Sequence, residues 1–538
     1  MIFLYYVAGF ISHCKEKLTF IGGNVSDILS WIEVGKLSAE RDDNLVHYFF
    51  DNGVLQSVIN TPSSFLILGR KGAGKTALFR YLTNNPRQYL KENEVLVSLS
   101  FEDYNWRVHS LLSNEYAAES LAYKQSWKFV ILVEVIKAYL KYLEEKRLTI
   151  PKPLKNAKVA LEKIFDTPFP SISVLVGRKL LGLGKISLPK AGLDLSDGDL
   201  NSLELDGGEV NFESASNDPD LRDKLCNNID HLIDYFENCL RSSQPMHAKV
   251  FVCFDRIDEA WDEISVDVSR RVIAGLVTAA DAITPKYNGN IRPLIFLRED
   301  IFEVLSLNDS NKLREDCGAL LHWSRETLMK MLLQRINYYA ANVNKDLVHD
   351  VDELFDRHEM RQRAKPFNYL MKRSMMRPRD MICLLTKTIS SMRDDKNDPF
   401  SDNDFVGDKL EVEYIYQAEP GYSEWLKQEI NDEWAVQRPE IKILLSAIQN
   451  HSSTIFTKNE LVTELQKIDA NYNTELINEQ IRFMFDISLI GFKVGQSTIW
   501  RYKCFYPSQG FIDSDEYKIH DGLIRVLNLK EPRDKSDA

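Results

Sequence analysis

The chain has 538 residues, with 67 Lys and Arg against 79 Asp and Glu, a formal net charge of −12 and a pI near 5.5. A hydrophobic content of 44% and a charged content of 27% exclude wholesale disorder, and the acidic balance excludes a histone-like coat for nucleic acid. The length suggests roughly two to four domains. The seven Cys are scattered without a C-x-x-C pair, which is typical of reduced thiols in a cytoplasmic protein.

The N-terminal residues 1–13 are apolar, but a membrane-spanning helix needs about 20 apolar residues. They also lack the basic residues and the small-residue cleavage site of a secretory signal. A membrane anchor and a buried strand or helix both stay open for this segment, and no other segment is long enough to span. Residues 1–62 as a whole predict an N-terminal helical adaptor, with helices at 25–34 and 42–59.

A glycine-rich stretch follows a predicted strand at residues 64–68 and precedes a helix-forming run. Residues 69–76 read Gly-Arg-Lys-Gly-Ala-Gly-Lys-Thr and match the pattern G-x-x-x-x-G-K-[ST]. Glycines let successive backbone N–H groups surround a phosphate, Lys75 would reach the β- and γ-phosphates, and the Thr76 hydroxyl would ligate Mg²⁺. The pattern predicts ATP and Mg²⁺ as cofactors. The expected nucleotide-binding residues here are Gly69, Gly72, Ala73, Gly74, Lys75 and Thr76.

The next segments alternate between strands and helices. Strands are predicted at 94–100, 250–254 and 293–297, and helices at 127–146 and 221–240. This alternation favours an α/β fold with a parallel sheet and helices on both faces, a P-loop NTPase core over residues 63–305. In residues 150–216 apolar residues alternate with Gly and Asp, a pattern that predicts an insertion of short strands or loops.

An acidic cluster follows the strand at 250–254. Ligands bind at the carboxyl ends of strands in open α/β sheets, so Asp255 is predicted to hold Mg²⁺ beside Thr76. Asp258 and Glu259 come next, and either could activate the attacking water as a catalytic residue. A strand that ends in an acidic helix cap is the other interpretation of this segment.

Two arginines complete the expected site. Arg298 ends the strand at 293–297 and is predicted to act catalytically by sensing the γ-phosphate. Arg379 opens a helix at 379–392 in a helical lid over residues 306–393, and would reach the nucleotide from there. A surface salt bridge is the alternative for each. Arg314 is a weaker candidate for a finger that acts on a neighbouring subunit. Further lid helices are predicted at 324–343 and 352–360.

A linker and connector helix over 394–437 lead to a predicted winged-helix domain at 438–530. Its expected helices lie at 441–450, 458–468 and 474–487, and its expected wing strands at 492–494 and 499–502. The presumed recognition helix carries Arg482 as its one base, whereas the wing carries Lys493, Arg501 and Lys503. DNA binding through the wing and a structural or regulatory role are both open. The basic stretch 361–379 is either a contact surface or a solvated lid face.

The quoted motifs, with Asp255-Arg256-Ile257-Asp258-Glu259, Arg298-Glu299-Asp300 and Arg377-Pro378-Arg379-Asp380, resemble the STAND/AAA+ group of P-loop ATPases. The acidic segment is similar to the NACHT and KAP branches, because Arg256 stands where AAA+ unfoldases place a glutamate. The resemblance covers residues of about 35 to 525. It implies ATP binding, slow hydrolysis, a nucleotide-gated rearrangement and frequent oligomers, and many such bacterial ATPases occur in antiphage defence.

The sequence therefore predicts a Mg²⁺-dependent ATPase that works as a nucleotide-gated switch. Its expected partner is a protein effector or a further copy of the chain, and no membrane partner is expected. A nucleic-acid-binding ATPase of the origin-recognition or transposition-regulator type, with the winged helix on DNA, is the alternative. A scaffold that binds nucleotide without hydrolysing it is a third hypothesis.

Overall fold

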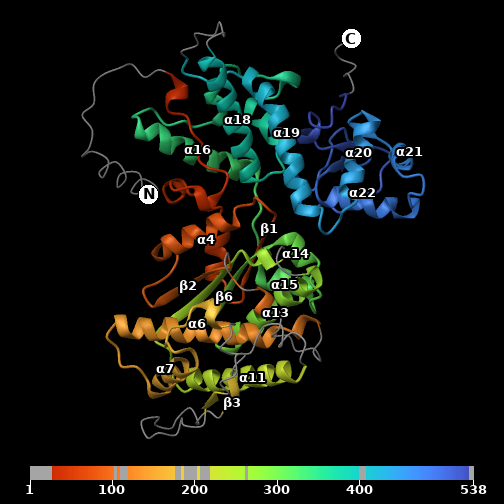
Figure 1. Ribbon diagram of the computed structural model, residues 1–538. Helices are drawn as coiled ribbons and strands as arrows, with labels where there is room; N and C mark the ends of the chain where they lie inside the picture. Colours follow the sequence, from red (N-terminus) through yellow and green to blue (C-terminus); the bar gives the residue numbers. More distant parts are fainter. Residues whose placement is uncertain are drawn as a thin grey trace, which may run out of the picture.

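The computed structural model describes residues 27–101, 104, 106–109, 119–175, 183–186, 203–205, 219–260, 265–398 and 407–531. The apolar residues 1–13 and much of the insertion predicted at 150–216 lie outside this part of the chain. Among the described helices, none is long and apolar enough to cross a membrane. Figure 1 shows a sheet-containing core, a group of helices above it, and a smaller domain beside those helices.

The core is built on a parallel sheet of five strands in the order β2-β5-β6-β1-β7. The strands are β1 (Leu66–Gly69), β2 (Glu94–Ser100), β5 (Lys249–Asp255), β6 (Ile291–Arg298) and β7 (Gly318–Leu320). Strand β6 separates β1 from β5, and its register pairs Arg298 with Gly69. The predicted parallel sheet is confirmed, and β7 is an edge strand that the sequence did not indicate.

Helices cover both faces of the sheet because successive strand residues point to opposite sides. Leu66 and Leu68 face one hydrophobic core, whereas Ile67 between them faces another. The first face is covered by α6 (Lys124–Glu145) and α13 (Val266–Lys286), and α11 (Pro219–Arg241) packs against α6. The second face is covered by α3 (Val54–Asn60) and α4 (Lys75–Asn84).

The insertion begins with a helix rather than with short strands. Helix α7 (Lys152–Phe165) carries a proline in its first turn, where the missing N–H costs nothing, and buries Leu154, Leu161 and Phe165 in the core. The expectation of a loop-rich segment is therefore wrong for this part. A two-stranded antiparallel ladder follows, β3 (Leu183–Ile186) with β4 (Leu203–Leu205).

The lid is helical, as predicted. After α14 (Glu299–Glu303) and α15 (Ser310–Cys317) it consists of α16 (Arg325–Asn342), α17 (Pro366–Arg373), α18 (Pro378–Asn397) and α19 (Glu413–Trp434). The helix expected at 352–360 is a single 3-10 turn, η7 (Val351–Leu354). The Asp352 carboxylate accepts a hydrogen bond from the Phe367 N–H, and Phe355 bridges to Leu410, so the backbone leaves the helical path. Helix α18 also extends into the stretch predicted as a linker.

The N-terminal segment is mostly irregular. In place of helices at 25–34 and 42–59 it forms η1 (Ile28–Ser30), η2 (Ala39–Arg41), α2 (Leu45–Tyr48) and α3. Gly53 interrupts the second predicted helix with φ +91°. Ile28 and Ile32 are buried in the core of the lid, so this segment is fastened to the lid.

The C-terminal domain has the predicted winged-helix architecture. Its helices are α20 (Ile441–His451), α21 (Lys458–Ile468) and α22 (Ile477–Asp486), and its strands are β8 (Ile455–Phe456), β9 (Ile490–Phe492) and β10 (Tyr517–Ile519). The wing strand expected at 499–502 is wrong, because Arg501 makes only an isolated bridge to Phe492. The antiparallel partner of β9 is β10, much later in the chain.

Candidate functional site

The glycine-rich loop joins the carboxyl end of β1 to the first turn of α4. Gly72 has φ +80° and Gly74 has φ +101°, a region that residues with a Cβ rarely adopt. A Cβ on Gly72 would lie 3.3 Å from the Cβ of Arg379. The loop backbone is therefore curled, and the lid packs directly against it.

Lys75 folds back onto the loop in this structure. Its Nζ donates hydrogen bonds to the carbonyl oxygens of Gly69 (2.8 Å) and Arg70 (3.2 Å). Burial of the ammonium lowers the pKa of Lys75, and the nearby Asp258 opposes this shift. An anion placed on the loop would compete with the two carbonyls for this cation.

Asp255 ends β5 and is buried. Its carboxylate accepts a hydrogen bond from the Thr76 hydroxyl, but its Oδ2 has no hydrogen-bond partner. Burial, and then the charge of Asp258, raise the pKa of Asp255 to about 7. An unsatisfied buried carboxylate oxygen next to a hydroxyl fits a hard divalent cation, so Thr76 and Asp255 could hold Mg²⁺.

Asp258 and Glu259 lie on the 3-10 turn η6 (Ile257–Glu259) that follows Arg256. The Glu259 Oε1 is 2.7 Å from the Arg256 Nε, so an ion pair holds this carboxylate. The charge of Asp258 influences the pKa values of Lys75 and Arg298. Asp258 is therefore the acid that is electrostatically coupled to the loop lysine and to the arginine of β6.

Arg298 is held by partners within the chain. Its guanidinium donates to Asp300 at 2.7 and 3.2 Å and to the Glu433 carbonyl at 3.2 Å. Burial alone would lower the pKa of Arg298, but Asp300 raises it above the ordinary value, so the charge is permanent. The Arg298 backbone is paired with Gly69 in the sheet, and its side chain lines the same cleft as Thr76 and Asp255, the edge at which the sequence places it.

The lid contributes Arg379, and also a residue that the sequence analysis missed. The Arg379 Nη1 donates to Glu429 at 3.0 Å. Arg377 is buried, and its Nη1 donates to the carbonyl of the loop residue Lys71 at 3.2 Å and to Glu433 at 3.2 Å. No local pattern distinguishes Arg377 from Arg379, so only the packed structure identifies it as a loop contact.

An open cleft of about 260 Å³ collects these groups. Its walls include Gly72, Gly74, Lys75, Thr76, Asp255, Asp258, Glu259, Arg298 and Arg379. Gly69 and Ala73 belong to the loop but do not line the cleft. The Gly69 carbonyl accepts from Lys75, and the Ala73 carbonyl accepts from the Trp323 indole at 2.8 Å. Arg314 is not in this cleft, because it pairs with Glu299 and Glu303 on α14.

The N-terminal segment supplies another wall that was not predicted. Glu40 lines the cleft; burial would raise its pKa, but the Ser38 hydroxyl and the charges of Arg256 and Arg379 lower it. Next to it, Arg335 of α16 donates to Asp42 at 3.2 Å and to the Val34 carbonyl at 2.9 Å. This buried pair fastens the segment over the cleft.

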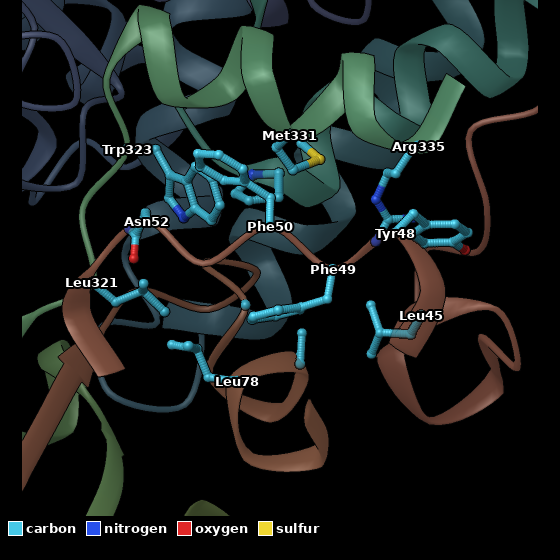
Figure 2. A pocket seen from close by; sticks show the side chains of 13 residues that line it. Leu45, Tyr48, Phe49, Phe50, Asn52, Leu78, Leu321, Trp323, Met331 and Arg335 are labelled. Carbon is cyan, nitrogen blue, oxygen red and sulfur yellow. The ribbon is translucent and has the colours of Figure 1, made fainter. Parts of the chain in front are cut away.

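A second, smaller pocket of about 40 Å³ adjoins the cleft, and the two share Gly74, Ala77, Arg335 and Pro378. Figure 2 shows aromatic rings of the N-terminal segment and Trp323 around it, with Met331 and Arg335 of α16 above. The ring centroids of Phe50 and Trp323 are 6.2 Å apart. Its apolar and aromatic walls have the chemistry that a nucleobase prefers, but a base would enter only after these side chains move apart, because ligand pockets have volumes of about 300 Å³ or more.

The basic residues predicted for the wing do not form one surface. The Lys493 ammonium lies 4.3 Å from the centre of the Trp500 ring, at the wing. Arg501 donates to the Gln509 side chain, whereas Lys503 faces a cleft between core, lid and winged helix. Arg482 also lines that interdomain cleft, so the presumed recognition helix is turned towards the core.

The basic stretch 361–379 is largely occupied by contacts within the lid. The Arg373 Nε is 2.6 Å from Glu419, and the Arg361 guanidinium lies 4.2 Å from the centre of the Tyr416 ring. Together with the pairs of Arg377 and Arg379, these contacts favour a structural role over a nucleic-acid surface.

The chain resembles known proteins in three comparisons. Residues 326–431 match the model of the FunZ-associated C-terminal helical domain, which corresponds to α16 through most of α19. The chain is 23% identical over 531 residues to the "Putative transposon gamma-delta 80.3 kDa protein" of Escherichia coli K12, covering 92% of this chain and 67% of that protein.

Solved structures resemble the chain only distantly. They include Cdc6p from Pyrobaculum aerophilum (9% identity, TM-score 0.30, covering 93% of this chain and 95% of that one) and the Aeropyrum pernix ORC1 protein in complex with DNA (8% identity, TM-score 0.34, covering 86% and 90%). Drosophila ORC bound to DNA is a third (10% identity, TM-score 0.28, covering 96% and 95%).

Proposed function

We propose that the protein is a Mg²⁺-dependent ATPase that acts as a nucleotide-gated switch. The observation that supports it is the gathering of Lys75, Thr76, Asp255 and Arg298 around one cleft, from three segments of the chain. Lys75 would bind the β- and γ-phosphates, and Thr76 with Asp255 would hold the cation. Bound Mg²⁺ would neutralise charge that develops on the phosphates during hydrolysis.

The remaining charged groups of the cleft have complementary roles in this proposal. Asp258 would orient or deprotonate the attacking water, and Arg298 and Arg379 would stabilise the terminal phosphate. The aromatic pocket of Figure 2 would open to hold the base. Because the loop contacts the lid through Arg377 and the winged helix through Arg70, occupancy of the site would alter both domains.

The output of the switch is proposed to be control of a protein effector or assembly with further copies of the chain. The motif resemblance to STAND and AAA+ ATPases favours a setting in bacterial antiphage defence.

Binding and hydrolysis of ATP by the purified chain test the proposal. The wild type is expected to bind ATP with Mg²⁺ and to release phosphate slowly, whereas Lys75→Ala should weaken ATP binding by about 100-fold or more, since it removes the cation from the loop. Lys330→Ala, on the surface of α16, is the matched control. Wild-type protein that neither binds nor hydrolyses ATP, or a Lys75→Ala variant that equals the control, refutes the proposal.

A nucleic-acid-binding ATPase is the second candidate, and the name of the E. coli relative, which refers to a transposon, favours it. Lys493 beside Trp500 combines a cation with an aromatic face, a pairing that suits nucleic acid at the wing. Salt-dependent DNA binding that is lost when Lys493, Arg501 and Lys503 are changed to Glu would support it. Binding that is absent, or that does not respond to salt, removes it.

A further inference from the structure

The C-terminal end of α19 is acidic and faces the arginines of the nucleotide cleft. Glu429 accepts from Arg379 at 3.0 Å, and the Glu433 carboxylate accepts from Arg377 at 3.2 Å. The Glu433 backbone carbonyl accepts from Arg298 at 3.2 Å. The last carbonyls of a helix also carry the negative end of its dipole. One helix end therefore supplies negative charge to three arginines at once.

Two of these arginines, Arg298 and Arg379, line the cleft in which phosphates would bind. The Glu433 side chain is buried, and its Oε1 has no hydrogen-bond partner. A bound phosphate would thus compete with the end of α19 for Arg298 and Arg379. A triphosphate offers more negative charge and more acceptor oxygens than a carboxylate, so the arginines would favour it when it is present.

Helix α19 is also joined to the winged-helix domain by side-chain contacts. The Ser423 hydroxyl donates to the Gly522 carbonyl at 2.7 Å, and the Arg525 Nε is 2.8 Å from Glu419. Helix α20 begins shortly after α19 ends, and Figure 1 shows α19 between α18 and the winged-helix domain. A displacement of the end of α19 would therefore be passed to that domain.

We propose that Glu429 and the backbone carbonyl of Glu433, at the end of α19, are positioning groups that stand in for the terminal phosphate: they hold Arg379 and Arg298 while the site lacks ATP, and they release α19 when the γ-phosphate captures these two arginines. This inference rests on the proposed ATP site. Beyond the binding of ATP, the acidic end of α19 converts the presence of the γ-phosphate into movement of the winged helix. ADP lacks the phosphate that would capture the arginines and leaves α19 in place.

Glu429→Gln tests the competition. The variant keeps the shape of the side chain and removes its charge, so ATP should bind about fivefold more tightly, because the lost pair is partly exposed and worth about 1 kcal/mol. ADP affinity should change by less than about twofold, and the ATP-to-ADP preference should rise by the difference. Glu424→Gln, on the exposed side of the same helix, is the matched control and should behave as wild type. Both affinities are measured by titration of fluorescent nucleotide analogues.

Hydrogen–deuterium exchange of the wild-type chain provides a measurement that needs no variant. Amides at the end of α19, residues 429–440, should exchange several-fold faster with a non-hydrolysable ATP analogue than with ADP. Unchanged or slower exchange there, or a Glu429→Gln variant whose ATP-to-ADP preference equals that of the control, overturns the inference even though ATP still binds. If the wild type binds neither nucleotide, the proposed function itself fails.

Discussion

The Arg70 Nη1 in the phosphate loop donates a hydrogen bond of 3.2 Å to the Ser488 hydroxyl of the winged helix, 418 positions later in the chain. The loop is therefore in direct contact with the last domain. The same Ser488 oxygen accepts from the Cys504 N–H at 2.8 Å, so it joins the loop to the segment after the wing.

This contact predicts an energetic coupling between loop and winged helix. Urea unfolding of Arg70→Ala, Ser488→Ala and the double variant should give a coupling energy of about 0.5–1.5 kcal/mol. Ser488→Ala should cost more than the coupling alone, because it also leaves the buried Cys504 N–H without an acceptor. Additive effects of the two substitutions would show that the contact contributes nothing.

The two acids after β5 are predicted to differ in importance. Asp258→Asn should reduce the single-turnover rate of ATP hydrolysis by about 100-fold or more, because a positioned base contributes that much. Glu259→Gln should reduce it by less than about tenfold, since Arg256 already holds this carboxylate at 2.7 Å. A larger loss in Glu259→Gln would assign the base to Glu259 instead.

The aromatic cavity predicts how the site would hold a base. Ala77 borders both the cavity and the phosphate cleft, so Ala77→Phe should fill the cavity and weaken ATP binding by about tenfold or more. Inorganic tripolyphosphate, which has no base, should bind the variant and the wild type equally. Equal losses for both ligands would mean that the substitution disturbs the loop itself.

Gly35 is predicted to be needed for the packing of the N-terminal segment against Arg335 of α16. A Cβ there would lie 2.2 Å from the Tyr48 hydroxyl and 2.5 Å from the Arg335 Nη1, at φ +77°. Gly35→Ala should therefore lower the free energy of unfolding by more than about 2 kcal/mol. Gly53→Ala is the control: its φ is +91° but nothing lies within 4 Å, so only the backbone cost of about 1 kcal/mol applies. Equal effects would contradict the steric argument.

His520 predicts a loss of stability in mild acid. Burial lowers the pKa of His520 from the ordinary 6.5 to about 4. Between these values the unfolded chain binds a proton that the folded chain does not, so the free energy of unfolding falls as the pH drops from 6.5 towards 4, by up to about 1.4 kcal/mol per pH unit. His520→Asn should remove this part of the slope in urea unfolding at pH 5–7. Parallel slopes for the two proteins would contradict the prediction.

The residues at strand ends could be predicted from the sequence because parallel strands place their carboxyl ends along one edge. That geometry alone brings Asp255 and Arg298 to the loop, and the structure has both in the cleft. The contacts of Arg377 and Glu429 could not be predicted, because they depend on how the start of α18 packs against the loop and how α19 packs against α18.

The errors in the fold have the same origin. Residues 352–360 have a helical pattern, but the Asp352 carboxylate binds the Phe367 N–H and ends the helical turn early. Residues 499–502 alternate like a strand, yet β9 pairs with Tyr517–Ile519, a segment that local alternation did not connect with the wing. In both places a contact with a distant segment overrides the local pattern.

The position of β6 sets the width of the cleft. Because β6 lies between β1 and β5, these two strands stand two inter-strand spacings apart, about 10 Å. Neighbouring strands would leave half that width, too little for a phosphate group beside a hydrated cation. The first turn of α4 crosses the gap and brings the Thr76 hydroxyl to Asp255. The middle strand therefore sets the distance between the strand that leads into the phosphate loop and the strand that carries Asp255.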